Sequence, residues 1–150
     1  MATYIASDLL TKPLPGIDQA AAYFGTISGM AAAPAAADLL RPLKLPGGFR
    51  LGALLVNVRT AFGAAGTTAK IGISHTDGSS TATYFTDATT QIAASTDATL
   101  ASTGTKVVMP QSGVFTTVKE SFLEIVVSAV VTPVAGVADF CALGEFTGSR

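Results

Sequence analysis

The chain has 150 residues, of which 49% are hydrophobic and only 13% are charged, and its formal net charge is −1. That length fits one domain, and the charged share is about half of what a soluble globular domain usually carries. Lysine and arginine occur singly, without the basic stripe that neutralises phosphates, so we expect no nucleic-acid partner.

The first sixteen residues are predicted to form an extended arm. Pro13 and Pro15 hold the backbone extended and remove two hydrogen-bond donors. The leucines of this arm can dock on this protein or on a neighbour, although a disordered tail is also common at a terminus. Because a solvated tail would carry more charge, we favour docking. Residues 17–150 are expected to form a single β-sandwich domain.

The sequence near the N-terminus has no basic start followed by an apolar stretch, so we expect no secretory signal. The uncharged run over residues 19–37 is interrupted by glycine and proline and is too weakly apolar to span a bilayer. We therefore expect no membrane partner and a chain that is made in a cytoplasm.

Residues 47–62 (GGFRLGALLVNVRTAF) carry a clear strand signal. A Gly-Gly turn is followed by apolar side chains at every second position, which is the period of a strand with one face in a core. Asn57 and Arg59 fall on the opposite face and are our candidates for contacts with another subunit or with a shell. The apolar members are Leu54, Val56, Val58 and Phe62.

Other segments predict further strands, separated by turn signals every eight to twelve residues or so. Residues 38–45 contain prolines typical of an edge strand, and Asp77-Gly78 predicts a hairpin turn. Residues 121–131 (SFLEIVVSAVV) predict a covered central strand, with Glu124 and Ser128 on its wetter side. The remaining strand signals lie at residues 23–28, 68–75, 81–86, near 92 and 100, and at 106–110, 114–118 and 137–146. About eight antiparallel strands without a long helix predict an all-β sandwich or barrel.

The sequence contains no recognisable catalytic or metal-binding motif. His75 is the only histidine, and a metal site needs several converging ligands, so we interpret it as a strand-end residue. A Ser-His-Asp triad with Asp77 or another aspartate stays open, because triads form in space, but no G-x-S-x-G is present. Residues 62–66 do not match a phosphate-binding loop. We therefore expect no catalytic, cofactor-binding or metal-binding residue, no cofactor and no enzyme.

Two other groups have alternative interpretations. Cys141 is the only cysteine, so no disulfide can form within the chain, and we interpret it as a small buried hydrophobe rather than a reactive thiol. The carboxylates mostly fall at turns or strand ends, where they bind backbone amides. A glycosidase pair drawn from distant strands would be invisible in the sequence, but tryptophan, which commonly stacks on sugars, is absent. The carboxylates are Asp8, Asp18, Asp38, Asp77, Asp87, Asp97, Asp139, Glu120, Glu124 and Glu145.

Residues 23–85 contain, in order, the motifs YFGTISG, an alanine-rich loop, DLLRPLKLPGGFRL, LLVNVRTAF, TTAKIGISHTDG and TYF. With these motifs the segment resembles the small capsid decoration, or cement, proteins of bacteriophages. The resemblance implies a jelly-roll β-sandwich that assembles as a homotrimer on the outer surface of the capsid of a virion. It also implies the major capsid protein as partner, an N-terminal arm that contacts the shell or a neighbouring subunit, and no catalytic residue. The serine-, threonine- and alanine-rich residues 87–105 depart from the pattern and leave open which loop faces the capsid.

Two other functions remain as alternatives. One is a structural module of a phage tail, fibre or baseplate, which would also be β-rich and trimeric. The other is a carbohydrate-binding or hydrolytic β-sandwich domain, which the absence of tryptophan disfavours.

Overall fold

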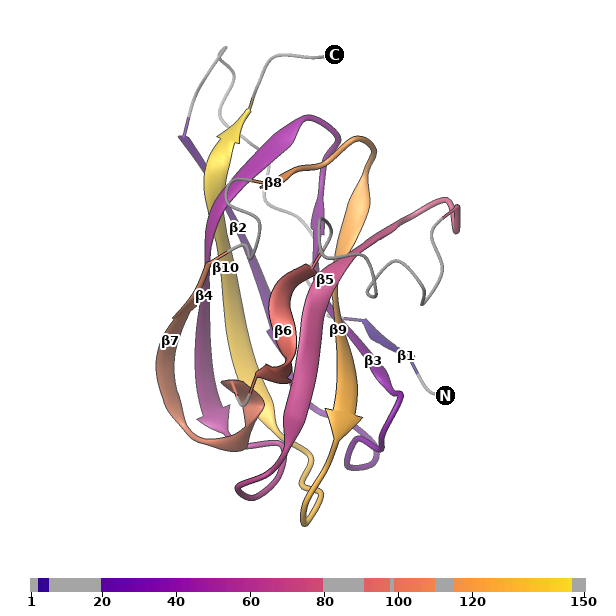
Figure 1. Ribbon diagram of the computed structural model, residues 1–150, viewed down its shortest axis with the longest axis vertical. Coiled ribbons are helices and arrows are strands. Elements are labelled where there is room, and N and C mark those ends of the chain that lie inside the picture. The colour runs from indigo at the N-terminus through magenta and orange to yellow at the C-terminus, as the bar shows by residue number, and fades with distance from the viewer. Residues whose placement is uncertain (1–2, 6–19, 80–90, 98, 110–114, 147–150) are drawn as a thin grey trace.

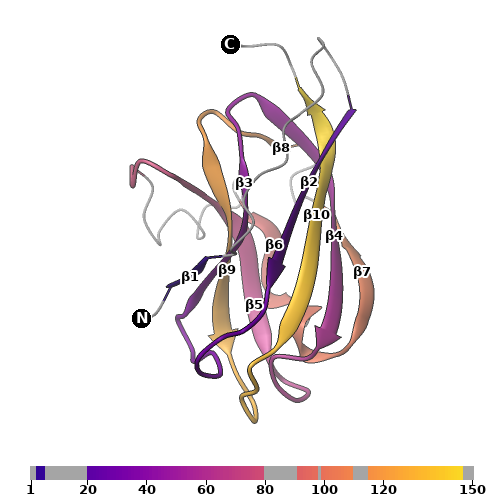
Figure 2. The same ribbon diagram turned by 180° about the vertical axis from the view of Figure 1, so that it is seen from behind.

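The chain folds into two β-sheets packed face to face (Figure 1; Figure 2 shows the same arrangement from behind). The computed structural model describes residues 3–5, 20–79, 91–97, 99–109 and 115–146. Sheet A has the strand order β1 (Thr3–Ile5), β3 (Leu39–Leu45), β9 (Ser121–Ala129), β5 (Thr68–His75) and β6 (Gln91–Asp97). Sheet B has the order β2 (Ala20–Ile27), β10 (Val137–Phe146), β4 (Phe49–Thr60) and β7 (Gly104–Val108), and the short β8 (Phe115–Thr116) also pairs with β4.

The strand order is that of a jelly roll. Apart from the short β1 and β8, the described strands number eight, and every pairing among them is antiparallel. In chain order, sheet B contains the first, eighth, third and sixth of them, and sheet A the second, seventh, fourth and fifth. The chain thus crosses repeatedly between the sheets, as in a double Greek key. The expected all-β sandwich of jelly-roll type with about eight strands is confirmed.

Strand β4 anchors the interior of the sandwich. Its alternation places Leu54, Val56 and Val58 in the core, each no more than 1% exposed, as predicted. Phe62, just past the end of the strand, is also fully buried, and Asn57 and Arg59 lie on the outer side. Inward side chains of β3, β5, β9 and β10 complete one continuous core.

Strand β2 of sheet B and strand β3 of sheet A approach so closely that only glycine fits between them. A Cβ added to Gly25 of β2 would lie 1.9 Å from the carbonyl oxygen of Pro42 in β3. Pro42 itself falls in the irregular register between Leu40 and Leu43, where β3 follows β9 imperfectly. The two sheets therefore meet at this edge backbone to backbone.

Strand β9 is central in sheet A, between β3 and β5, as expected. The assignment of Glu124 to a wetter side was wrong, because its side chain is only 3% exposed. Arg41 of β3 binds its carboxylate at 2.5 Å and Ser74 of β5 donates a hydrogen bond to it at 2.8 Å. Both neighbouring strands thus contribute a polar side chain over Glu124, whereas Ser128 is exposed as predicted.

The remaining expectations have mixed outcomes. Leu100 lies in a 3-10 helix, η2 (Thr99–Ala101), rather than in a strand, and it is buried. The predicted edge strand at residues 38–45 is one strand in from the edge, because β1 pairs in parallel with its residues Leu39 to Arg41. The predicted strand at residues 81–86 lies outside the described residues. So does the arm, except for the three residues of β1.

Candidate interaction surface

The outer face of sheet B carries an apolar row across all four of its long strands. Phe24 of β2 pairs with Cys141 of β10, Cys141 pairs with Leu55 of β4, and Leu55 pairs with Val107 of β7. Successive side chains of a strand alternate between faces, so these four point away from the core that their neighbours fill. Phe24 is 57% exposed and Val107 is 61% exposed.

The next row extends this surface toward the start of β4. Leu143 of β10 pairs with Ala22 of β2 and with Ala53 of β4, and Leu143 is 37% exposed. Met109 directly follows β7 and is 61% exposed. We call the two rows the apolar face. Its members are Ala22, Phe24, Ala53, Leu55, Val107, Met109, Cys141 and Leu143.

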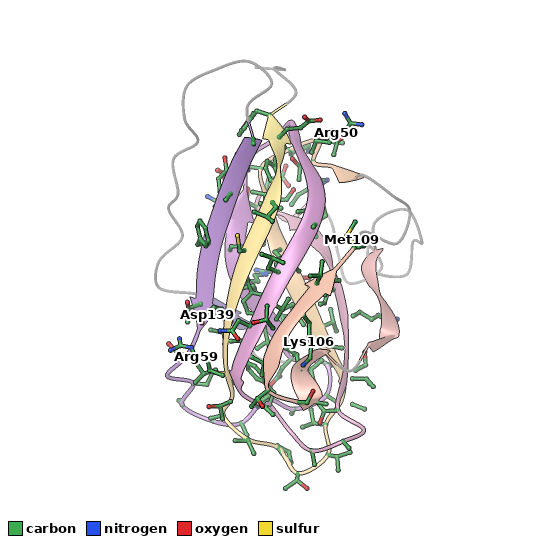
Figure 3. The ribbon with its side chains drawn as sticks, turned by 90° about the vertical axis from the view of Figure 1, so that its left-hand side faces the viewer. Arg50, Arg59, Lys106, Met109 and Asp139 are labelled. Carbon is green, nitrogen blue, oxygen red and sulfur yellow. The ribbon has the colours of Figure 1, made fainter. Side chains whose placement is uncertain are left out.

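An ion pair of β4 and β10 borders the apolar face at each end (Figure 3). Arg50 binds Glu145 at 2.9 Å at one end, and Arg59 binds Asp139 at 3.0 Å at the other. The basic member belongs to β4 and the acidic member to β10 in both pairs. Arg59, a predicted contact residue, therefore lies on the border of the apolar face.

A polar row completes the border near Arg59. Thr26 donates a hydrogen bond to Asp139, and Thr105 donates one to Asn57. Asn57, the other predicted contact residue, thus lies in this row between β10 and β7. The two predicted residues share one face, and the apolar side chains between the borders are the part that the sequence analysis missed. The available signal was the run Leu54-Leu55-Val56, which is apolar on both faces of the strand.

One end of the sandwich consists of loops that contain almost no charge. The β2–β3, β4–β5 and β9–β10 loops gather at the lower end of Figure 1. Val131 and Val134 are 44% and 41% exposed there, and Asp38, at the end of the first loop, is buried and accepts a hydrogen bond from the Ala35 amide. We call these loops the uncharged end. They comprise residues 28–37, 61–67 and 130–136.

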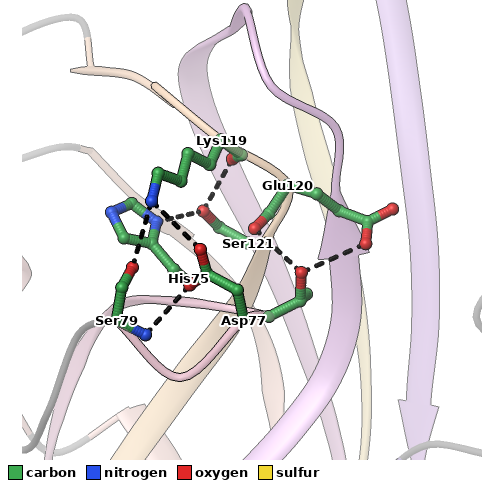
Figure 4. Close-up of polar contacts among 7 residues, drawn as sticks. His75, Asp77, Ser79, Lys119, Glu120 and Ser121 are labelled. Atoms are coloured by element: carbon green, nitrogen blue, oxygen red, sulfur yellow. Dashed lines mark hydrogen bonds and ion pairs between the residues drawn. The ribbon is translucent and has the colours of Figure 1, made fainter.

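The opposite end carries a charged cluster that joins the turn after β5 to the segment before β9 (Figure 4). Lys119 binds Asp77 at 3.0 Å, and the Ser79 amide donates to the other oxygen of that carboxylate. Hydrogen bonds from Ser79, with a further one from Lys119, hold the pKa of Asp77 well below its usual range. Glu120 binds Lys44 at 2.7 Å, and this contact lowers the pKa of Glu120. The two contacts therefore stabilise this end of the sandwich at neutral pH and weaken as acid protonates the carboxylates.

His75 lies in the same cluster, and its contact with Ser121 is not the base–nucleophile contact of a catalytic triad. The Ser121 hydroxyl donates its hydrogen bond to the Lys119 carbonyl oxygen at 2.8 Å. The Nδ1 atom of His75 lies 3.1 Å from the same hydroxyl oxygen, whose proton is therefore already used in the bond to Lys119. Ser121 is fully buried, and Asp77 is bound by Lys119 and Ser79. The geometry is that of a strand end tied to a neighbouring segment.

Cys141 is half-buried in the apolar face rather than enclosed in the core, because alternation in β10 turns it outward. Burial raises the pKa of its thiol, which disfavours the nucleophilic thiolate. Within the part of the chain that the structure describes, no three histidine, cysteine or acidic side chains come together as metal ligands. No helix among the described residues is long and apolar enough to cross a bilayer.

No family model matches the sequence, and no curated protein is significantly similar to it. Solved structures do share its fold. A chain in the capsid of Ralstonia phage GP4 is 16% identical, with a TM-score of 0.70 over 99% of each chain. A chain in the capsid asymmetric unit of cyanophage Pam1 is 13% identical, with a TM-score of 0.60 over 93% of this chain and 94% of that one. The protein therefore has the same fold, over almost its whole length, as chains found in phage capsids.

Proposed function

We propose that this protein is a structural component of a bacteriophage virion that binds the outer surface of the capsid shell as a decoration protein. The observation that carries the proposal is the match to a chain in the Ralstonia phage GP4 capsid over 99% of both chains. Coverage that is nearly complete on both sides means that the two chains are of similar length. The likeness thus extends over nearly the whole of both chains and is not confined to one segment of either.

The major capsid protein is the proposed partner, and the uncharged end is the proposed contact with it. Small apolar loops such as those around Val131 and Val134 can bury area without desolvating charges. We further propose that the protein acts as a homotrimer, because three linked weak contacts give far higher avidity than one. The role is mechanical: the decoration protein is made in the host cytoplasm, uses no cofactor and catalyses no reaction.

Replacing Val134 by aspartate is expected to weaken binding to capsids by about ten-fold or more, because the contact would bury an unpaired charge. The measurement is co-sedimentation of the purified protein with capsids stripped of their decoration protein. Val118→Asp is the matched control, since Val118 is 83% exposed at the opposite end of the sandwich.

Wild-type binding to capsids should change little between low and moderate salt, because the uncharged end forms few ion pairs.

The quaternary state and location of the protein test the same proposal. Light scattering of the purified wild-type protein should give the mass of three chains or a multiple of it. A monomer that does not bind capsids would refute the proposal. A tagged protein found on tails in labelled particles would instead establish the alternative, a tail, fibre or baseplate module.

Deleting residues 1–16 is expected to leave the sandwich folded while lowering capsid binding or trimer stability. Strand β1 pairs only with residues Leu39 to Arg41 of β3, so its loss removes few contacts of the sandwich among the described residues. Circular dichroism should keep its β-sheet signal, while co-sedimentation and the trimer mass report the loss. If both binding and mass stay unchanged, the arm has no part in assembly.

A further inference from the structure

The charges around the apolar face are arranged so that the face is complementary to itself. Strand β4 carries Arg50 and Arg59, and the adjacent β10 carries Glu145 and Asp139. A two-fold axis parallel to the strands, lying between two copies of sheet B and passing midway between β4 and β10, places β4 of each copy over β10 of the other. We propose that two copies of this chain pair through their apolar faces about such an axis.

This axis matches opposite charges at both borders. The axis keeps each residue at its height along the strands, so Arg50 lies over Glu145 of the second copy and Arg59 over Asp139 of the second copy. A two-fold axis perpendicular to the strands would instead place Arg50 over Arg59 and acid over acid. Like charges brought together at an interface disfavour association. The charges therefore select the axis parallel to the strands.

The apolar rows also match under this axis. Phe24, on the first strand of sheet B, lies over Val107 of the second copy, on the last strand, and Cys141 lies over Leu55 of the second copy. A larger side chain thus opposes a smaller one at both positions. Two sheets packed about 10 Å apart with nearly aligned strands fit this arrangement.

The size and polarity of the face suit an interface between two proteins. Four strands at about 4.8 Å spacing, followed over about nine residues between the border charges, cover roughly 600 Å². That is the lower end of the area per partner in specific protein complexes, which have an apolar centre and a polar rim. Arg50, Glu145, Arg59 and Asp139 are between 38% and 54% exposed and form such a rim.

The pairing suits the proposed function but does not depend on it. An axis parallel to the strands leaves the uncharged ends of both copies at the same end of the pair, where both can contact one shell. If the protein is also a trimer, the two-fold contact joins subunits of neighbouring trimers, since two-fold and three-fold interfaces use different surfaces. The test needs no capsid, so a failure of the pairing and a failure of capsid binding can be told apart.

The only cysteine of the chain provides a direct probe. Under the proposed axis, Cys141 lies beside Cys141 of the second copy, displaced sideways by about one strand spacing, or 4.8 Å. A short bismaleimide, applied at mildly alkaline pH because burial raises the pKa of this thiol, should convert most of the full-length protein to a covalent dimer. Chains around a three-fold axis could reach at most two-thirds conversion, and Cys141→Ala should give none.

Reversing a border charge should abolish the pairing. Arg59→Glu is expected to lower the cross-linking rate about ten-fold or more and to halve the mass measured by light scattering. The double variant Arg59→Asp with Asp139→Arg, which exchanges the charges in both copies, should restore both. Lys70→Glu makes the same charge change on the outer face of sheet A and should have no effect.

A second variant does not rely on charge. Leu55→Asp at the centre of the face should also prevent cross-linking, while an unchanged melting curve shows that it folds. The proposal is overturned if wild-type Cys141 does not cross-link, if conversion stops at two-thirds, or if Arg59→Glu cross-links like the wild type.

Discussion

Replacing Gly25 by alanine is expected to destabilise the sandwich by about 3 kcal/mol or more. The added Cβ would lie 1.9 Å from the Pro42 oxygen and 2.7 Å from its carbonyl carbon. Both are backbone atoms, so neither can rotate away, and β2 and β3 would have to separate along the edge where the sheets meet. Chemical denaturation followed by circular dichroism measures the free energy of unfolding.

Gly52→Ala is the matched control, in another strand of sheet B. The nearest atom to its added Cβ is the Leu143 oxygen at 3.6 Å, an ordinary contact. We expect this variant to remain within about 0.5 kcal/mol of the wild type. Equal stabilities of the two variants would show that the close approach of Gly25 and Pro42 is not a constraint on the fold.

Replacing Arg41 by methionine is expected to lower the free energy of unfolding by about 3 kcal/mol. The variant leaves the charged Glu124 buried, and the Ser74 hydroxyl is then its only side-chain donor among the described contacts. The stacking of Arg41 on the Phe122 ring, 4.9 Å from its centroid, is lost as well. Adding Glu124→Gln to this variant should recover most of the loss, since a neutral amide can still accept the Ser74 hydrogen bond. The measurement is again denaturant unfolding.

Lys44→Met provides the comparison for an exposed ion pair. Its partner Glu120 is 54% exposed, so water already solvates the carboxylate, and removing the lysine should cost less than about 1 kcal/mol. Suppose that Arg41→Met lowers the free energy of unfolding by no more than Lys44→Met does. In that case the buried ion pair of Arg41 with Glu124 contributes no more to stability than the exposed pair of Lys44 with Glu120.

The sequence by itself determined which residues form most of the strands and which side of the central strands is buried. The alternation at Leu54, Val56 and Val58 and the apolar run of β9 required only local geometry, since the side-chain period of a strand does not depend on its partners. Glycine and aspartate likewise marked turns, because Gly48 and Gly78 adopt positive φ angles that other residues rarely take.

Only the tertiary structure decided which strands are neighbours, and with them the surfaces. β2 and β10 pair although more than a hundred residues separate them, for example Phe24 with Cys141. The apolar row exists because this register brings one outward-facing side chain from each of four strands side by side. Glu124 is polar by sequence yet buried, because Arg41 and Ser74 reach it from strands on either side. The period of a strand determines its faces, whereas partners and register depend on contacts between distant segments that no local pattern encodes.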